Sequence, residues 1–173
     1  NGSTLMNPIE DEPERDAARL GAITRLFELA ARTLHSAGHS HGLYPAQWTA
    51  LRYLASAAPG QRTSSALARF QQMAIGPVTR SVRVLIEKGL VVKGGSAGHH
   101  RSERLDLTPR GRALLDEDPL LAVDANLKRL APDDLFLLSS VLGRIIATLH
   151  PRDEEAGAPG LEAAFDDADD VRR

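Results

Sequence analysis

The sequence predicts a mainly α-helical protein that contains one short β-hairpin. Apolar residues recur three or four positions apart in several segments, as they do on the buried face of an amphipathic helix. Residues 90–107 instead combine a short apolar run with an alternation of charged and apolar residues, the pattern of paired strands. The chain has 173 residues, enough to bury a sizeable core, and its length favours one domain with an appended segment.

The first helix is predicted from about Pro13 to Ala37. Proline suits the first turn of a helix, and Gly38 suits the position just after its end. The apolar stripe of this helix, spaced 3, 4, 3 and 4, consists of Leu20, Ile23, Phe27, Ala30 and Leu34. Residues 1–12 are expected to be a tag remnant and a flexible N-terminus.

Two helices follow, separated by a turn at Pro59-Gly60. Tyr44-Pro45 opens the first of them, whose shared apolar side consists of Trp48, Leu51, Leu54 and Ala55. Thr63 is the predicted N-cap of the second, which runs to about Gln71 and directs Leu67 and Phe70 inward.

A further helix is predicted from about Ile75 to Lys88. Its buried stripe consists of Val78, Val82 and Leu85, at positions i, i+4 and i+7. The opposite face then consists of Gly76, Thr79, Arg80 and Arg83. Gly89 is expected to end the helix in the left-handed conformation.

Two strands are predicted next, at 90–93 and 103–107, joined by a loose turn at 94–98 and a basic tip. Gly94-Gly95-Ser96-Ala97-Gly98 matches the G-x-S-x-G pattern of a nucleophilic serine. That pattern requires a strand before it and a helix after it, whereas a strand follows here. We therefore interpret Ser96 as a residue of the turn and predict that the protein is not an enzyme.

The C-terminal part is predicted to be helical. Thr108-Pro109 pairs an N-cap with a proline in the first turn, and Pro119 should kink or interrupt the helix that follows. That helix bears an apolar stripe of Leu120, Val123, Leu127 and Leu130. Pro132 begins a last helix, whose stripe consists of Leu135, Leu138, Leu142, Ile145 and Leu149.

Three short helices followed by a two-stranded hairpin form the winged helix-turn-helix pattern. The terminal helices carry apolar stripes that such a small unit cannot cover, which predicts a homodimer formed through them. The predicted division is 13–44 for the N-terminal dimerisation helix and link, 45–112 for the winged helix-turn-helix, 113–150 for the C-terminal dimerisation helices, and 151–173 for an acidic, disordered tail.

Charge is distributed unevenly along the chain. The total is only −2, yet residues 61–112 carry ten basic and three acidic residues, a net +7. Residues 1–60, 113–150 and 151–173 carry −1, −3 and −5. A basic middle with acidic flanks indicates a segment that neutralises phosphates, with a solvated basic face as the alternative.

Four stretches together resemble the MarR (multiple antibiotic resistance regulator) family of transcription factors, over roughly residues 15–150. They are Gln47-Trp48 with Leu51-Arg52-Tyr53-Leu54; Thr63 with Leu67-Ala68; Val78-Thr79-Arg80 leading to Lys88-Gly89-Leu90-Val91; and Arg101 with Leu107-Thr108-Pro109-Arg110-Gly111-Arg112. The chain departs from the family pattern at Ala74 and Pro77, where a capping residue and Ser or Thr are usual. The resemblance implies a ligand-responsive DNA-binding regulator, most often a repressor, that acts as a homodimer.

The expected DNA-binding residues lie on the fourth helix, before it, and on the hairpin. A helix in the major groove reads base edges, a helix N-terminus suits a phosphate, and an arginine at a wing tip suits the minor groove. The expected set is Thr63, Ser64, Ser65, Gln72, Gly76, Pro77, Thr79, Arg80, Arg83, Lys93, His99, His100, Arg101 and Arg104.

Two classes of effector remain open. By the resemblance, a small aromatic or phenolic ligand would bind near His35, His39, Tyr44, Trp48 and Arg52. The alternative is a metal-responsive regulator that uses His35, His39 and His41, and a second alternative is a winged-helix module for protein contacts. We expect no cofactor. The absence of cysteine and of a long apolar run predicts a cytoplasmic protein without a disulfide framework or a membrane span.

Overall fold

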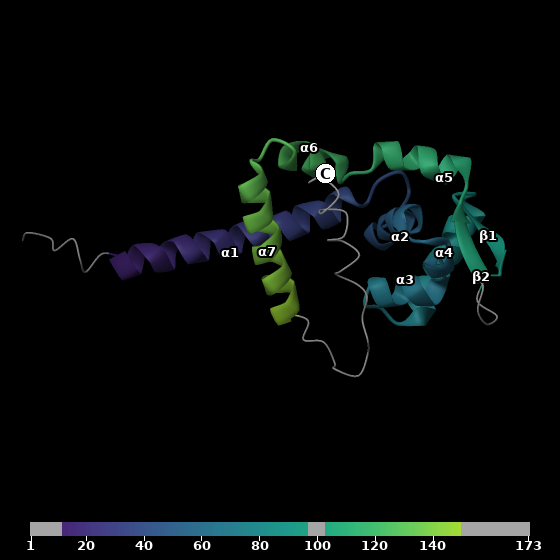
Figure 1. The fold of residues 1–173 in the computed structure, drawn as a ribbon, viewed down its shortest axis with the longest axis horizontal. Coiled ribbons are helices and arrows are strands. Elements are labelled where there is room, and N and C mark those ends of the chain that lie inside the picture. Colours follow the sequence, from purple (N-terminus) through teal and green to yellow (C-terminus); the bar gives the residue numbers. More distant parts are fainter. Residues whose placement is uncertain (1–11, 97–102, 150–173) are drawn as a thin grey trace, which may run out of the picture. The chain divides into compact units, whose positions relative to one another are not determined.

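The structure, a computed structural model, describes residues 12–96 and 103–149 (Figure 1). The chain divides into two compact units, Asn1–Pro45 and Ala46–Arg173. Among the described residues, no helix is both long and apolar enough to span a membrane. The predictions for the N-terminus, the hairpin tip and the acidic tail concern residues outside the described ranges.

The first unit contains one long helix, α1 (Glu12–Ala37), as predicted. Glu12 and Glu14 lie in its first turn, where the helix dipole favours negative charge. Beyond its end, the Gly38 amide still donates to the carbonyl of Leu34 at 3.1 Å. A Cβ atom at Gly38 would lie 2.9 Å from the ring of Pro45, so the chain needs glycine at this turn. No described residue of α1 itself is buried.

The second unit is built around α2 (Pro45–Ser56), the short 3-10 helix η1 (Pro59–Gln61), α3 (Ser64–Phe70) and α4 (Ile75–Glu87). Figure 1 shows α2, α3 and α4 gathered beside the hairpin. Their large, fully buried side chains are Trp48, Leu51, Leu54, Leu67, Val78 and Leu85. These residues are the apolar stripes predicted from helical spacing, and they form the core that holds α4 in place.

Two predictions about side-chain direction in this core are wrong. Phe70 was expected to point inward but is 41% exposed, because it lies at the end of α3 and packs its ring on Tyr53, with centroids 4.8 Å apart. Ala55 was expected to share the buried side of α2 and is exposed, since that side is already filled by the larger Trp48, Leu51 and Leu54.

The hairpin consists of β1 (Val91–Ser96) and β2 (Glu103–Leu107), paired antiparallel in the register Val91 with Leu107 and Ser96 with Glu103. The first strand is longer than predicted, because Gly94, Gly95 and Ser96 belong to β1 rather than to a turn. The pairing is irregular between Lys93 and Ser96, and Gly95 has φ +57, a conformation that glycine adopts easily. The glycines therefore permit a bulge without ending the strand.

The helix after the hairpin is interrupted, as Pro119 predicted. It comprises α5 (Pro109–Leu114), a 3-10 turn η2 (Leu115–Glu117) and, after Pro119, α6 (Leu121–Leu127). Thr108 caps α5: its hydroxyl accepts from the Gly111 amide at 3.0 Å and donates to the Gly89 carbonyl at 2.7 Å. This cap joins the end of β2 to the left-handed turn after α4.

A buried carboxylate holds the interruption in place. Asp118 is only 8% exposed and accepts from both the Leu120 amide at 2.8 Å and the Arg52 guanidinium at 2.8 and 3.0 Å. Arg52 lies on α2, so this ion pair connects the core of the winged helix to the chain leading into α6. Nothing in the sequence predicted that Arg52 and Asp118 would form this ion pair.

The last helix, α7 (Pro132–Leu149), begins at the predicted proline. Its predicted apolar stripe is partly buried from Leu135 to Ile145, whereas Phe136 and Leu137 on other sides are 73% and 60% exposed. In the described part of the chain, neither α6 nor α7 has a fully buried residue. These helices thus keep much of their apolar surface uncovered within one copy of the chain.

Candidate nucleic-acid interface

The exposed face of α4 is the centre of the candidate interface. Packing of Val78, Val82 and Leu85 into the core turns the opposite side of the helix outward, as the spacing predicted. Thr79, Arg80 and Arg83 are exposed on that side. The two guanidinium groups and the threonine hydroxyl are chemically suited to base edges and phosphates.

The start of α4 depends on backbone conformation, as the sequence indicated. Ala74 is the N-cap residue and makes no side-chain capping bond, and Pro77 lies in the first turn. The Thr79 hydroxyl donates to the Ile75 carbonyl at 2.9 Å, one turn back along the helix, and its oxygen can still accept a hydrogen bond. Gly76 and Pro77 are both partly buried, so each offers less surface to a ligand than Thr79 does.

A groove of about 300 Å³ lies where α3, α4 and the hairpin meet. Its polar lining combines hydroxyl groups, two cations and one carboxylate: Thr63, Ser64, Ser65, Thr79, Arg83, Lys93 and Glu103. Segments that are far apart in the sequence therefore bring several of the predicted residues to one surface. The groove is large enough for a phosphate group and contains donors suited to it.

Thr63 has a structural role that the prediction of DNA binding did not include. Its side chain is the N-cap of α3 and accepts a hydrogen bond from the Ala66 amide at 3.2 Å, while the residue is only 8% exposed. Ser64 and Ser65, which follow it, are the more accessible hydroxyls of the groove.

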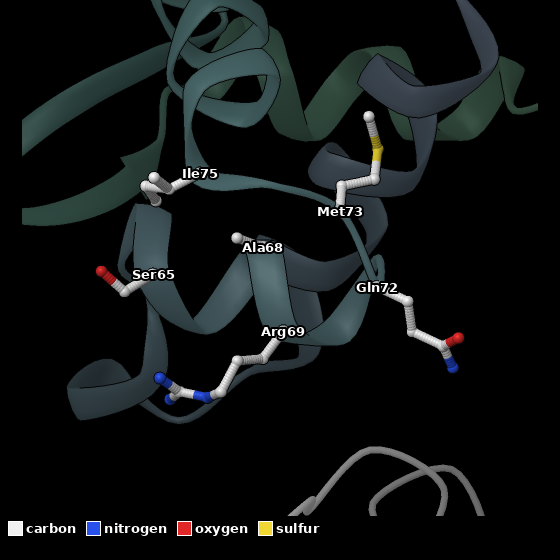
Figure 2. A pocket seen from close by; sticks show the side chains of 6 residues that line it. All are labelled: Ser65, Ala68, Arg69, Gln72, Met73 and Ile75. Carbon is white, nitrogen blue, oxygen red and sulfur yellow. The ribbon is translucent and has the colours of Figure 1, made fainter. Parts of the chain in front are cut away.

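A second hollow, of about 530 Å³, lies between α3 and the start of α4 (Figure 2). Its lining residues are Ser65, Ala68, Arg69, Gln72, Met73 and Ile75. Gln72 is exposed and has φ +52, the left-handed conformation that turns the chain between the two helices. Arg69 was not among the predicted site residues. Its positive charge, next to the turn between α3 and α4, is the sequence feature that could have identified it.

The described hairpin cations already have anionic partners. Lys93 lies 2.7 Å from Glu103, and the Arg104 Nε donates to Asp106 at 2.8 Å. Asp106 also accepts from Arg62 at 3.3 Å. Burial raises the pKa of Asp106, but hydrogen bonds from Arg104 and Arg62 outweigh it, so the pKa is lowered overall.

Contact of Lys93 and Arg104 with the DNA backbone stays a prediction, and both side chains take part in ion pairs within the hairpin. The remaining predicted wing residues, His99, His100 and Arg101, lie outside the described residues.

The residues predicted to contact a ligand fall in both compact units. His35, His39 and Tyr44 belong to the first. The His39 ring contacts both others, with centroids 5.2 Å from His35 and 5.4 Å from Tyr44. Trp48 is 0% exposed in the core of the second unit, and Arg52 is bound to Asp118. Structural roles account for Trp48 and Arg52, and their ligand role remains a prediction.

The metal site predicted from His35, His39 and His41 is not formed by these three residues together. Within residues 12–96 and 103–149, no group of three or more His, Cys, Asp or Glu side chains is placed to hold a metal ion. His35 and His39 approach each other, and His41 lies in the following turn with φ +54.

Part of this chain is similar to a known protein family. Residues 41–102 match the model of the MarR family. This segment runs from the turn after α1 through α2, α3, α4 and β1, and therefore includes the helical part of the candidate interface. No curated protein is similar enough to the chain to count as a match.

Solved structures share the fold. A probable transcriptional regulator from Pseudomonas aeruginosa is 27% identical, with a TM-score of 0.53, and the match covers 73% of this chain and 96% of that one. A MarR family protein of Mycobacterium tuberculosis, solved with salicylic acid, is 28% identical, with a TM-score of 0.50 and coverage of 72% and 93%. A Streptomyces coelicolor MarR family transcriptional regulator, solved with DNA, is 21% identical, with a TM-score of 0.62 and coverage of 82% and 94%.

Proposed function

We propose that this chain, whose residues 41–102 match the model of the MarR family, is a DNA-binding transcriptional regulator of that family. The proposed form is a homodimer on a pseudo-palindromic operator, with α4 of each copy in the major groove. The single observation that carries the proposal is the outward face of α4, where Thr79, Arg80 and Arg83 are exposed beside the polar groove.

The groove supports a division of roles among these residues. Arg80 and Arg83 project from α4 and can donate to base edges or phosphates, whereas Ser64 and Ser65 approach from the adjacent end of α3. A protein on duplex DNA makes many of its hydrogen bonds to phosphates, which fix its register, and fewer to bases, which select the sequence. We assign base recognition to α4 and positioning to the serines and the hairpin.

The homodimer is supported by apolar surface that one copy does not bury. The exposed large apolar residues of α1 and α7 are Leu20 (66%), Ile23 (50%), Leu26 (63%), Leu29 (53%), Leu34 (40%), Phe136 (73%), Leu137 (60%), Ile146 (40%) and Leu149 (70%). A soluble protein rarely leaves so much apolar surface on two helices, and a second copy is the simplest cover. In a dimer, the two α4 helices would lie about one DNA turn apart, roughly 34–36 Å.

We further propose that the protein is a repressor and that a small aromatic or phenolic ligand releases it from DNA. Two of the similar structures support this class of effector: the Mycobacterium tuberculosis protein was solved with salicylic acid, and a Staphylococcus aureus MarR with salicylate and kanamycin. Such a ligand lowers DNA affinity only by as much as it prefers the dimer geometry that does not fit DNA.

The test uses duplexes that the protein itself selects from a random pool, and fluorescence anisotropy at several salt concentrations. Arg83→Ala should weaken binding by roughly 5–150-fold, the effect of about 1–3 kcal/mol for a lost arginine contact to a base. Arg129→Ala is the matched control, since Arg129 is an exposed arginine after α6, away from the groove. Equal binding by the parent and Arg83→Ala would refute the assignment of α4.

A protein-interaction module is the competing function. It predicts that the protein selects no sequence from the random pool. Salt dependence alone does not separate the two functions, because non-specific binding to phosphates also weakens as salt rises.

A further inference from the structure

Two histidines at the C-terminal end of α1 face each other. His35 lies in the last turn of the helix and His39 two residues beyond its end, at positions i and i+4. The Gly38 amide donates to the Leu34 carbonyl at 3.1 Å and the His39 amide to the Ser36 carbonyl at 3.0 Å, so the helical path continues far enough to keep both rings on one side. Their Nε2 atoms are 3.5 Å apart, and both residues are exposed to solvent.

This separation suits a shared metal ion better than a hydrogen bond. An N–H donor usually lies about 2.7–3.2 Å from its acceptor, and 3.5 Å is at the outer limit. Zinc binds histidine nitrogen at 2.0–2.1 Å, so two nitrogens on one tetrahedral ion lie about 3.3–3.4 Å apart. Only a slight rotation of either ring would bring the observed pair to that distance.

We propose that His35 and His39 form a bidentate site for a divalent first-row transition metal such as Zn²⁺, Ni²⁺ or Cu²⁺. Imidazole nitrogen is a good ligand for these ions, whereas Mg²⁺ and Ca²⁺ require oxygen ligands. The ring of Tyr44 packs edge-on against His39, with centroids 5.4 Å apart and planes at 88°, and so limits the orientations that the His39 ring can take.

The coordination shell would be incomplete with these two ligands. In the part of the chain that the structure describes, no third His, Cys, Asp or Glu joins them in a metal-binding group. Water or an added small ligand would fill the remaining positions, as in metal sites that keep open positions. The ion would connect the last turn of α1 to the turn at residues 38–44. The site involves no residue of the proposed DNA interface.

The experiment uses the full chain, treated with a chelator and then dialysed. Zn²⁺ binding is measured by calorimetry, and Co²⁺ is used in parallel because its visible absorption bands report coordination number. The variants are His35→Gln, His39→Gln, the double variant, and His41→Gln as the matched control in the same turn. Circular dichroism checks that each variant keeps its helices, which is expected because all three histidines are exposed.

The parent should bind one equivalent of Zn²⁺. Either His35→Gln or His39→Gln should weaken binding by roughly 10²-fold, because each converts a two-point attachment into a single one. The double variant should bind no more tightly than either single variant, and His41→Gln should resemble the parent.

Three results would overturn the site: no binding by the parent, parental binding by the double variant, or a loss in His41→Gln as large as in the other two. DNA binding by the same proteins in chelator reports on the proposed regulator separately, so either idea can fail alone.

Discussion

Removal of the buried ion pair between Arg52 and Asp118 should destabilise the protein far more than removal of an equally short pair on its surface. Arg52→Ala takes away the Nη1 group, which lies 2.8 and 3.0 Å from the two oxygens of Asp118. The Asp118 carboxylate, whose side chain is only 7% exposed in the intact protein, then loses its counterion and keeps the hydrogen bond from the Leu120 amide. A buried charge that loses its counterion becomes a strong source of instability.

The magnitude follows from the exposure of the two side chains. Breaking a fully buried pair costs about 3–5 kcal/mol. The Arg52 side chain is 31% exposed, so water can reach the carboxylate once the arginine is gone, and we expect about 2–3 kcal/mol. For a protein of this size, that corresponds to a fall in melting temperature of roughly 4–12 °C.

Arg32→Ala is the control for this experiment. Arg32 and Glu28 also form an ion pair at 2.8 Å, but their side chains are 67% and 64% exposed. An exposed pair of this kind contributes about 0.3–0.5 kcal/mol. Urea unfolding followed by circular dichroism, at equal protein concentrations, gives both free energies of unfolding. Equal losses in the two variants would refute the argument from burial.

Three further predictions concern the groove, the hairpin and the dimer. Glu103→Gln should tighten DNA binding several-fold at low salt, measured by anisotropy, because it removes a negative charge from the groove and releases Lys93; unchanged affinity would mean that DNA does not approach this groove. The lowered pKa of Asp106 means that its contribution to stability is present above the unfolded pKa of about 3.9 and is lost as pH falls through the folded pKa. Asp106→Asn should therefore lose less stability than the parent when urea unfolding is compared at pH 6 and pH 3, and parallel losses would contradict this. Leu137→Glu should convert a dimer to a monomer in sedimentation experiments without loss of helix, since Leu137 is 60% exposed in one copy; an unchanged mass would exclude this face of α7 from the interface.

Helical periodicity predicted most of the fold, because the buried stripes are decided locally. Val78, Val82 and Leu85 are the buried residues of α4, at the spacing that the sequence showed. The N-caps at Thr63 and Thr108 were also predicted from local chemistry, because a hydroxyl just before a helix can accept a hydrogen bond from an amide of the first turn. The prediction from the sequence made β1 too short, because a pair of glycines can form either a turn or a bulge within a strand.

The candidate site was only partly predictable. The spacing along α4 identified Thr79, Arg80 and Arg83 as an outward face, and the structure places all three as exposed residues. Spacing along β2 is compatible with the contact between Arg104 and Asp106, but it could not show that Asp106 also accepts from Arg62, 44 positions earlier in the chain. Alternate residues of a strand share a face, but only the paired hairpin determines which of them meet.

What the sequence by itself determined is the identity of the elements and the surface that each one turns inward. Those properties depend on residues within one or two helical turns of each other, where geometry is fixed by the backbone. Only the tertiary structure decided which charges are available and which are occupied. Arg52 and Asp118 are 66 positions apart, and Arg62 and Asp106 are 44 apart. An ion pair depends on separation in space, and packing of the core sets that separation independently of distance along the chain.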